Sequence, residues 1–293
     1  MKICIIIPFY YKWNNSANIK CHYDYLKNIY DVDLFSKKEL DGVDLNNYDL
    51  IMLHGSGAFL PNELYKSCNK PIFGFGWSDP NLFNEIHYEQ SHIYFTNDLN
   101  TYNKLEYFDK KVYYYQTACN KEFHKNLELD KITDVLVFGC GNHKFVTNRN
   151  EVVNKLRQKG FHIKVFGRGW DEHKDTHGFI EGKEFIKEIN QAKIVLDIIN
   201  ETSSWTHRIF EASACGTPVI TYDREDTKQL LKVGKEVFLY KNLEDIIDKL
   251  DTWLSYPGIL KDVGKLAQQR CYRDHDISVR IQELLKIIKE NGL

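Results

Sequence analysis

One short stretch, HRIFEASACGTPVITYD at 207–223, combines the residue types of an anion site and a sugar site. Arg208 stands where a helix is expected to begin, and a helix N-terminus beside an arginine fork favours a phosphate group. Glu211 follows in the first turns of that helix, and its carboxylate can accept hydrogen bonds from ribose hydroxyls. Ser204 lies just upstream, where it either caps the helix or contacts the ligand. The stretch predicts a diphosphate site beside a ribose-binding carboxylate.

Two further arginines stand at positions that suit the same ligand. The segment VFGCGNHKF at 137–145 predicts a strand that runs into a turn with Gly139 and Gly141, whose free N–H groups can hold phosphate. Arg149 opens the next expected helix, and Arg168 ends the following strand in VFGRGW. Thus three of the eight arginines in the chain fall at expected ends of strands and helices of one domain, and a chance placement of surface arginines is the alternative.

Such residues meet only if a scaffold brings strand ends to one edge, and strands alternate with helices along the whole chain. Continuous apolar runs such as KICIIIP are typical of parallel strands covered on both faces. The predicted strands are 2–8, 32–35, 49–55, 71–76, 92–96, 111–116, 134–141, 162–169, 193–199, 217–223 and 236–240. This alternation predicts an α/β protein with two Rossmann-like, doubly wound parallel-sheet domains facing across a ligand-binding cleft.

We expect four parts in the chain. Residues 1–116 form a Rossmann-like N-terminal domain for the acceptor, and 117–131 form a linker. Residues 132–275 form the Rossmann-like donor domain, and 276–293 form a C-terminal packing helix.

The N-terminal domain carries candidate residues after three of its strands. Tyr10, Tyr11 and Trp13 form an aromatic and polar segment after the first strand, suited to an acceptor sugar or simply an exposed loop. His54 follows a buried strand, where it either contacts the reaction centre or supports a turn. Asp79, in WSDP, either accepts a proton or serves the turn before proline.

The stretch at 207–223 resembles the donor-binding end of retaining GT-B glycosyltransferases, whose pattern is roughly E-x7-E followed by A-x-A-C-G-x-P-V-I. Glu211 matches the second glutamate, and Ser203 stands where the first would be. The form R-x-F-E-A-x-A-C-G, followed by GKEVFLY, is more similar to the CgeB-like (spore-coat-maturation) branch. The resemblance covers about 134–290, and the N-terminal half matches only in outline through SDP, YFTNDL and ACNKEF.

The resemblance implies a GT-B glycosyltransferase that moves a sugar from a nucleotide-diphosphate donor, by default a UDP-hexose, to an acceptor hydroxyl. It implies retention of configuration, no metal and no cofactor. It assigns donor contacts to His54 and, for the base, to Phe179 and Ile180 in HGFIEG. Candidate catalytic residues are His54, Asp79 and Arg208. The acceptor is open between a glycan, a protein, a small molecule and a modified DNA base.

Two other functions stay open. A GT-B nucleotide-sugar epimerase would need more carboxylates around the sugar than the motifs offer. A non-catalytic nucleotide-sugar-binding protein is compatible with the missing first glutamate.

Composition excludes several classes of protein. The 293 residues include 39 Lys and Arg against 41 Asp and Glu, a net charge of −2, which excludes a globally basic nucleic-acid binder. No run of 18 apolar residues exists, and the start MKICIIIPFYY reads as a strand rather than a signal peptide. The seven cysteines lack metal spacing, so we expect reduced thiols in a cytoplasmic protein. The sequence carries no signal for the oligomeric state.

Overall fold

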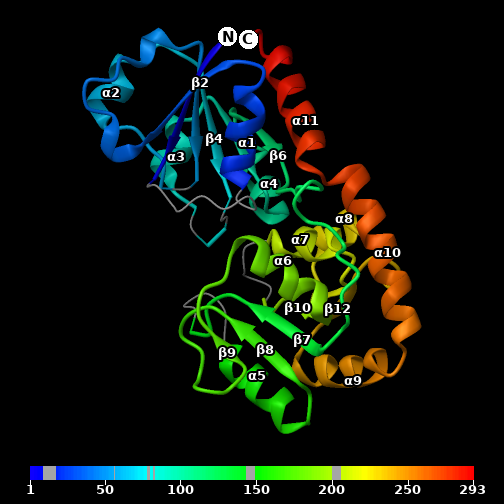
Figure 1. The fold of residues 1–293 in the computed structure, drawn as a ribbon. Helices are drawn as coiled ribbons and strands as arrows, with labels where there is room; N and C mark the ends of the chain where they lie inside the picture. Colours follow the sequence, from blue (N-terminus) through cyan, green and yellow to red (C-terminus); the bar gives the residue numbers. More distant parts are fainter. Residues whose placement is uncertain (9–17, 56, 78–79, 82, 143–148, 200–205) are drawn as a thin grey trace. The chain divides into compact units, whose positions relative to one another are not determined.

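The computed structural model describes residues 1–8, 18–55, 57–77, 80–81, 83–142, 149–199 and 206–293 (Figure 1). The predicted Tyr10, Tyr11, Trp13, Asp79 and Ser204 therefore lie outside the described residues. The chain divides into two compact units, residues 1–118 with 277–293 and residues 119–276. Each unit is built on a sheet of six parallel strands.

Unit 1 has the strand order β2-β1-β3-β4-β5-β6. Its strands are β1 (Lys2–Ile7), β2 (Asp31–Ser36), β3 (Leu50–His54), β4 (Ile72–Gly76), β5 (Ile93–Thr96) and β6 (Lys111–Tyr114). Its helices are α1 (Asn18–Lys27), α2 (Asn62–Ser67), α3 (Glu85–Gln90), α4 (Leu99–Leu105) and α11 (Ile277–Glu290). Strand order reverses between β1 and β3, so this sheet is doubly wound.

The C-terminal helix α11 packs with unit 1, although it is far from that unit in sequence. It lies beside α1 in the ribbon (Figure 1). Its Ile281 and Leu284 are buried in the same cluster as Ile3 and Ile5 of β1. The Tyr115 hydroxyl donates a hydrogen bond of 2.8 Å to the carbonyl of Arg280. Burial of this apolar stripe fixes the helix to unit 1.

Unit 2 has the strand order β12-β11-β10-β7-β8-β9. Its strands are β7 (Thr133–Phe138), β8 (Ile163–Phe166), β9 (Thr176–His177), β10 (Ala192–Leu196), β11 (Val219–Tyr222) and β12 (Phe238–Tyr240). Its helices are α5 (Arg149–Gln158), α6 (Gly182–Gln191), α7 (Arg208–Ala214), α8 (Glu225–Leu230), α9 (Leu243–Leu254) and α10 (Pro257–Asp274). Counted from β7, this is the strand order of a dinucleotide-binding Rossmann sheet.

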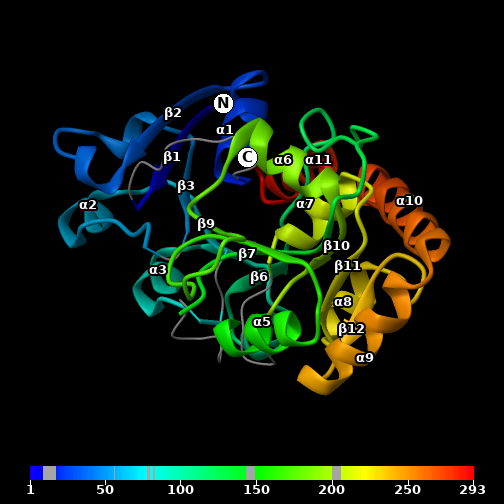
Figure 2. The ribbon, with the colours of Figure 1, turned by 60° about the horizontal axis from the view of Figure 1, so that its bottom comes forward.

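Alternating side chains of β7 fill two cores, one on each face of the unit 2 sheet. Val135 and Val137 lie in a cluster with residues of α5 and α9. Leu136 and Phe138 lie in the opposite cluster with residues of α6 and α7. Figure 2 shows α9 beside β12. A strand covered on both faces explains the continuous apolar run that predicted it.

Residues 119–131, expected to form a linker, group with unit 2. The backbone N–H of Cys119 donates to the carbonyl of His275 at 2.9 Å, and Cys119 forms an isolated parallel bridge with Asp276. All seven cysteines are free, and five of them are buried. None of the described helices combines the length and the apolar character that a bilayer crossing requires.

Candidate active site

The topological switch point of unit 2 lies between β7 and β10, which are neighbours in the sheet. The chain leaves β7 towards β8 on one side, and β10 continues towards β11 on the other. In open α/β sheets, the connections diverge at this point and leave a crevice outside the carboxyl ends of the strands. The two segments at that edge are the glycine turn after Phe138 and the segment that begins with Asp197.

The glycine turn after β7 needs its glycines for two different reasons. Gly139 has φ +123°, a conformation that other residues rarely adopt. Gly141 packs so closely on the turn after β8 that a Cβ there would stand 2.4 Å from the carbonyl oxygen of Gly169. The Trp170 indole Nε1 donates to the carbonyl of Gly139 at 2.8 Å. The predicted strand 134–141 therefore ends at Phe138, because the chain turns at Gly139.

Two arginine side chains converge on this turn. A Cβ placed on Gly139 would lie 2.7 Å from Nη1 of Arg149 and 3.9 Å from Nη2 of Arg208. Arg149 begins α5 and Arg208 begins α7, so two helix starts deliver both guanidinium groups to one point. Two like charges this close repel each other, and a bound anion would relieve that repulsion.

Arg149 is buried, with 6% of its surface exposed. Its Nε donates to the carbonyl of Ile198 at 2.8 Å, and its Nη1 donates to the carbonyl of Cys140 at 3.1 Å. Burial lowers the pKa of Arg149, Asp197 opposes this shift, and Arg208 adds to it. Within the described part of the chain, neither Arg149 nor Arg208 forms an ion pair, and Arg208 makes no hydrogen bond. Among the described residues, no carboxylate is therefore ion-paired with either guanidinium group.

Glu211 is buried, with 2% of its surface exposed, between two histidines. Its Oε1 lies 3.7 Å from Nε2 of His124, and its Oε2 lies 3.8 Å from Nε2 of His207. Burial raises the pKa of Glu211, but His207, His124 and Arg208 outweigh it, so the pKa falls below its ordinary value. The His207 side chain is 43% exposed. The carboxylate therefore faces the surface through His207.

The other predicted donor residues lie at the same end of unit 2 with less contact to the arginine pair. Arg168 is exposed, and its carbonyl accepts a hydrogen bond of 2.9 Å from the N–H of Gly141. Phe179 is 72% exposed, and Ile180 packs against the core on the α6 face. No described contact joins the Arg168, Phe179 or Ile180 side chains to Arg149 or Arg208.

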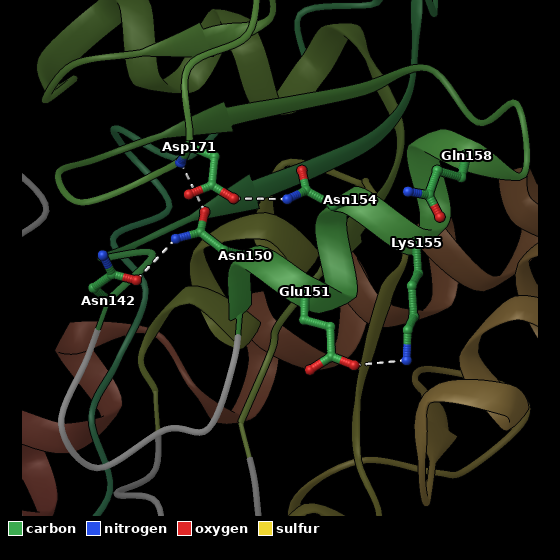
Figure 3. A pocket seen from close by; sticks show the side chains of 7 residues that line it. All are labelled: Asn142, Asn150, Glu151, Asn154, Lys155, Gln158 and Asp171. Carbon is green, nitrogen blue, oxygen red and sulfur yellow. Dashed lines mark hydrogen bonds and ion pairs between the residues drawn. The ribbon is translucent and has the colours of Figure 1, made fainter.

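A pocket of about 510 Å³ lies along α5, next to the glycine turn (Figure 3). Its lining is entirely polar: Asn142, Asn150, Glu151, Asn154, Lys155, Gln158 and Asp171. Asn150 donates to Asn142 Oδ1 at 2.9 Å and accepts from the N–H of Asp171 at 2.8 Å. Asn154 donates to Asp171 at 2.7 Å. These bonds, seen as dashed lines in Figure 3, tie the turns after β7 and β8 to α5.

His54 ends β3 of unit 1 and is completely buried. Its ring stacks on Phe75 at 4.2 Å between centroids, and its Nδ1 accepts a hydrogen bond of 3.2 Å from Nε1 of Trp77. Its Nε2 has no hydrogen-bond partner among the residues that the structure describes. Burial, with smaller contributions from His22 and His87, holds the pKa of His54 well below its ordinary value. His54 is therefore a neutral imidazole near neutral pH.

Sequence reasoning missed four residues around the arginine pair: Asp197, Tyr240, His124 and His207. Asp197 interrupts the apolar run KIVLDII, and that lone acid was the one available signal. The other three depend on contacts that only the folded unit brings together. The described residues contain no group of three or more His, Cys, Asp or Glu side chains placed to hold a metal ion.

Solved structures share this architecture along the whole chain. Sucrose-phosphate synthase from Thermosynechococcus elongatus superposes with a TM-score of 0.77 at 11% identity, over 99% of this chain and 100% of that chain. Anabaena Alr3699/HepE, solved in complex with UDP-glucose, superposes with a TM-score of 0.73 at 10% identity, over 98% and 99%. The chain has the GT-B fold. The predicted fold class of two Rossmann-like parallel-sheet domains is confirmed.

Other comparisons agree with this fold. A glycosyltransferase from Rickettsia africae superposes with a TM-score of 0.70 at 14% identity, over 99% of this chain and 98% of that chain. A family model described as glycosyl transferase-like matches residues 149–286, which include Arg149, Arg208 and Glu211. No curated protein is detectably similar in sequence. The narrower similarity to the CgeB-like branch stays a prediction.

Proposed function

We propose that this protein is a glycosyltransferase that moves a hexose from a uridine-diphosphate donor to an acceptor hydroxyl. The convergence of Arg149 and Arg208 on the Gly139 turn carries the proposal, because it places two positive charges at the switch point of a Rossmann-like sheet. The glycosyl transferase-like family model and the complex of Anabaena HepE with UDP-glucose support the choice of a UDP-sugar.

In the proposed reaction, the bond between the anomeric carbon and the diphosphate oxygen breaks, and the acceptor oxygen bonds to that carbon. Negative charge develops on the leaving diphosphate. Arg149 is held by its bonds to the carbonyls of Ile198 and Cys140, and Arg208 reaches the same glycine turn, so the pair faces this charge before the reaction begins. We assign to this pair the neutralisation that a divalent cation supplies in other enzymes. We further propose retention, in which the departing diphosphate takes the acceptor proton.

The other proposed contacts surround the diphosphate. Oε2 of Glu211 faces the half-exposed His207, and from this side we propose that it accepts a ribose hydroxyl. The exposed ring of Phe179 offers a stacking surface for the base, with Ile180 behind it. Arg168 adds a third positive charge at the carboxyl ends of the strands of unit 2. Gly139 and Gly141 let the backbone approach the phosphates.

In unit 1, His54 is proposed as a neutral donor to the hexose through Nε2, which bonds no group in the described part of the chain. Asp79 and the aromatic segment with Tyr10, Tyr11 and Trp13 stay predictions for the acceptor side.

A donor panel tests the proposal. The protein is incubated with UDP-, GDP- and ADP-hexoses, each with a glycan, a peptide, a small polyol or hydroxymethylated DNA as acceptor. Release of UDP together with a glycosylated acceptor is the expected result. Conversion of the donor hexose into an epimer would establish the epimerase instead, and binding without any turnover would establish a non-catalytic binder. Failure to bind or cleave any member of the panel would refute the proposal.

A further inference from the structure

We propose that Asp197 is the counter-charge of the Arg149–Arg208 pair: a positioning residue that anchors Thr206, two residues before Arg208, and lowers the affinity of the pair for a diphosphate. The inference deepens the proposed function and rests on it for the identity of the ligand. It concerns a carboxylate that belongs to no donor motif of the sequence. The observation behind it is a buried acid next to the carbonyl that Arg149 bonds, while no ion pair joins Arg149 or Arg208 to another described residue.

Asp197 directly follows β10 at the switch point, and only 4% of its surface is exposed. Its Oδ2 accepts hydrogen bonds from Thr206 Oγ1 at 2.9 Å and from Thr221 Oγ1 at 3.0 Å. Two hydroxyls that donate to the same oxygen are what an ionised carboxylate, which can only accept, requires. Thr221 belongs to β11, so the carboxylate is tied to the neighbouring strand.

The bond to Thr206 links Asp197 to the arginine pair, since Thr206 stands two residues before Arg208. On the other side, Arg149 Nε donates to the carbonyl of Ile198, the residue after Asp197. The segment that carries Asp197 is thus bonded to Arg149 itself and to the chain just before Arg208.

Asp197 acts on Arg149 without an ion pair. Among the described residues, no ion pair joins it to Arg149 or Arg208, yet its charge raises the pKa of Arg149 and opposes the lowering by burial and by Arg208. The other nearby acid, Glu211, lies 3.7 Å from Nε2 of His124 and 3.8 Å from Nε2 of His207.

This arrangement serves an anion site. A carboxylate bonded directly to the guanidinium groups would occupy the N–H donors that a diphosphate needs. A carboxylate held back by two threonine hydroxyls offsets the repulsion between the arginines and leaves those donors free. It also repels an incoming diphosphate. The site therefore binds UDP less tightly, and releases it more readily, than the two arginines would without Asp197.

The test measures binding of UDP, pyrophosphate and uridine to wild type and to Asp197→Asn by calorimetry at fixed ionic strength. Asparagine keeps the size of the side chain and one oxygen acceptor for both threonines, removes the charge, and replaces the other oxygen with an NH2 group. The Kd for UDP and for pyrophosphate is expected to fall about tenfold, and the Kd for uridine to stay the same. A purely structural Asp197 predicts weaker binding of all three ligands. That result, or an unchanged Kd for pyrophosphate, would overturn the inference.

Thr221→Val is the matched control, because it keeps the carboxylate and removes one of its hydroxyl donors. It is expected to destabilise unit 2 without tightening pyrophosphate binding, and tightening equal to that of Asp197→Asn would contradict the charge argument.

If Asp197→Asn does not fold, the single variant Arg149→Gln is compared with the double variant Arg149→Gln/Asp197→Asn. The double variant lacks the buried carboxylate, so it is expected to bind pyrophosphate more tightly than the single variant. Equal affinity of the two variants overturns the inference.

The proposed function and this inference fail separately. If wild type binds pyrophosphate but no nucleotide, the proposed UDP-sugar donor is wrong. The comparison with Asp197→Asn then still tests the role of the carboxylate. If wild type binds UDP and Asp197→Asn binds it no better, only the counter-charge is wrong. If no form of the protein binds any anion, both are wrong.

Discussion

Replacing Arg208 with alanine separates ligand binding from folding at this site. Arg208 makes no hydrogen bond and no ion pair among the described residues, and its Nη2 lies 3.9 Å from a Cβ placed on Gly139. The side chain therefore contributes little to the folded state. Its removal relieves the repulsion from Arg149 and removes the attraction to Glu211, so the free energy of unfolding is expected to change by no more than about 0.5 kcal/mol.

The loss in binding follows from the charge. A hydrogen bond to a charged group contributes about 1.5–3 kcal/mol. Because about 1.4 kcal/mol corresponds to tenfold in Kd, Arg208→Ala is expected to weaken UDP binding by roughly tenfold to 100-fold. Uridine carries no phosphate, so its binding is expected to stay the same.

The assay pairs calorimetric titration of UDP and uridine with urea unfolding of each variant. Arg273→Ala is the matched control, since Arg273 is 66% exposed and Asp274 is its one bonded partner among the described residues. That control is expected to bind UDP as wild type does. If Arg208→Ala binds UDP within twofold of wild type, the phosphate site lies elsewhere and the reasoning is refuted.

Three further predictions concern the scaffold. Gly139→Ala is expected to lose UDP binding and about 1–3 kcal/mol of stability, because the residue has φ +123° and a Cβ there would meet the Arg149 side chain. Gly160→Ala is the control: Gly160 has φ +93° and nothing within 4 Å of its Cβ position, so this variant is expected to lose stability but not UDP binding. Equal UDP affinity in the two variants would refute the prediction. Burial holds the pKa of His87 at about 4, below the ordinary 6.5, so the stability from its neutral form is complete above pH 6.5 and falls as the pH drops towards 4. In urea unfolding, the advantage of wild type over His87→Gln should shrink by about 2 kcal/mol between pH 7 and pH 5, and a constant difference would contradict the shift. In Tyr240→Phe, the backbone N–H of Ile199 loses the hydroxyl that accepts its hydrogen bond at 2.9 Å. Thermal unfolding should therefore show a loss of about 1–3 kcal/mol in the free energy of unfolding. An unchanged melting temperature would show that water replaces the hydroxyl.

Much of the fold could be predicted from the sequence, because buried parallel strands carry continuous apolar runs. The run KICIIIP predicted β1 to within one residue. Two elements were missed: β9 is only two residues long, in the polar segment DEHKDTHG, and α4 lies in a polar stretch after β5. Such short elements depend on pairing and packing with neighbours rather than on a local pattern.

The candidate site was predictable in part. Glycines at a turn and arginines at helix starts have local signatures, and the structure brings Gly139, Arg149 and Arg208 together. Asp197 has no such signature, since an acid at the end of an apolar run becomes informative only when Thr206 and Thr221 are seen to donate to it. The association of α11 with unit 1 likewise depends on contacts far apart in sequence.

A crystal structure with bound UDP tests the central claim most directly. We predict that the diphosphate lies against the Gly139 turn, with Arg149 and Arg208 both within hydrogen-bond distance of its oxygens. A diphosphate bound away from this turn, with either arginine uninvolved, would contradict the claim.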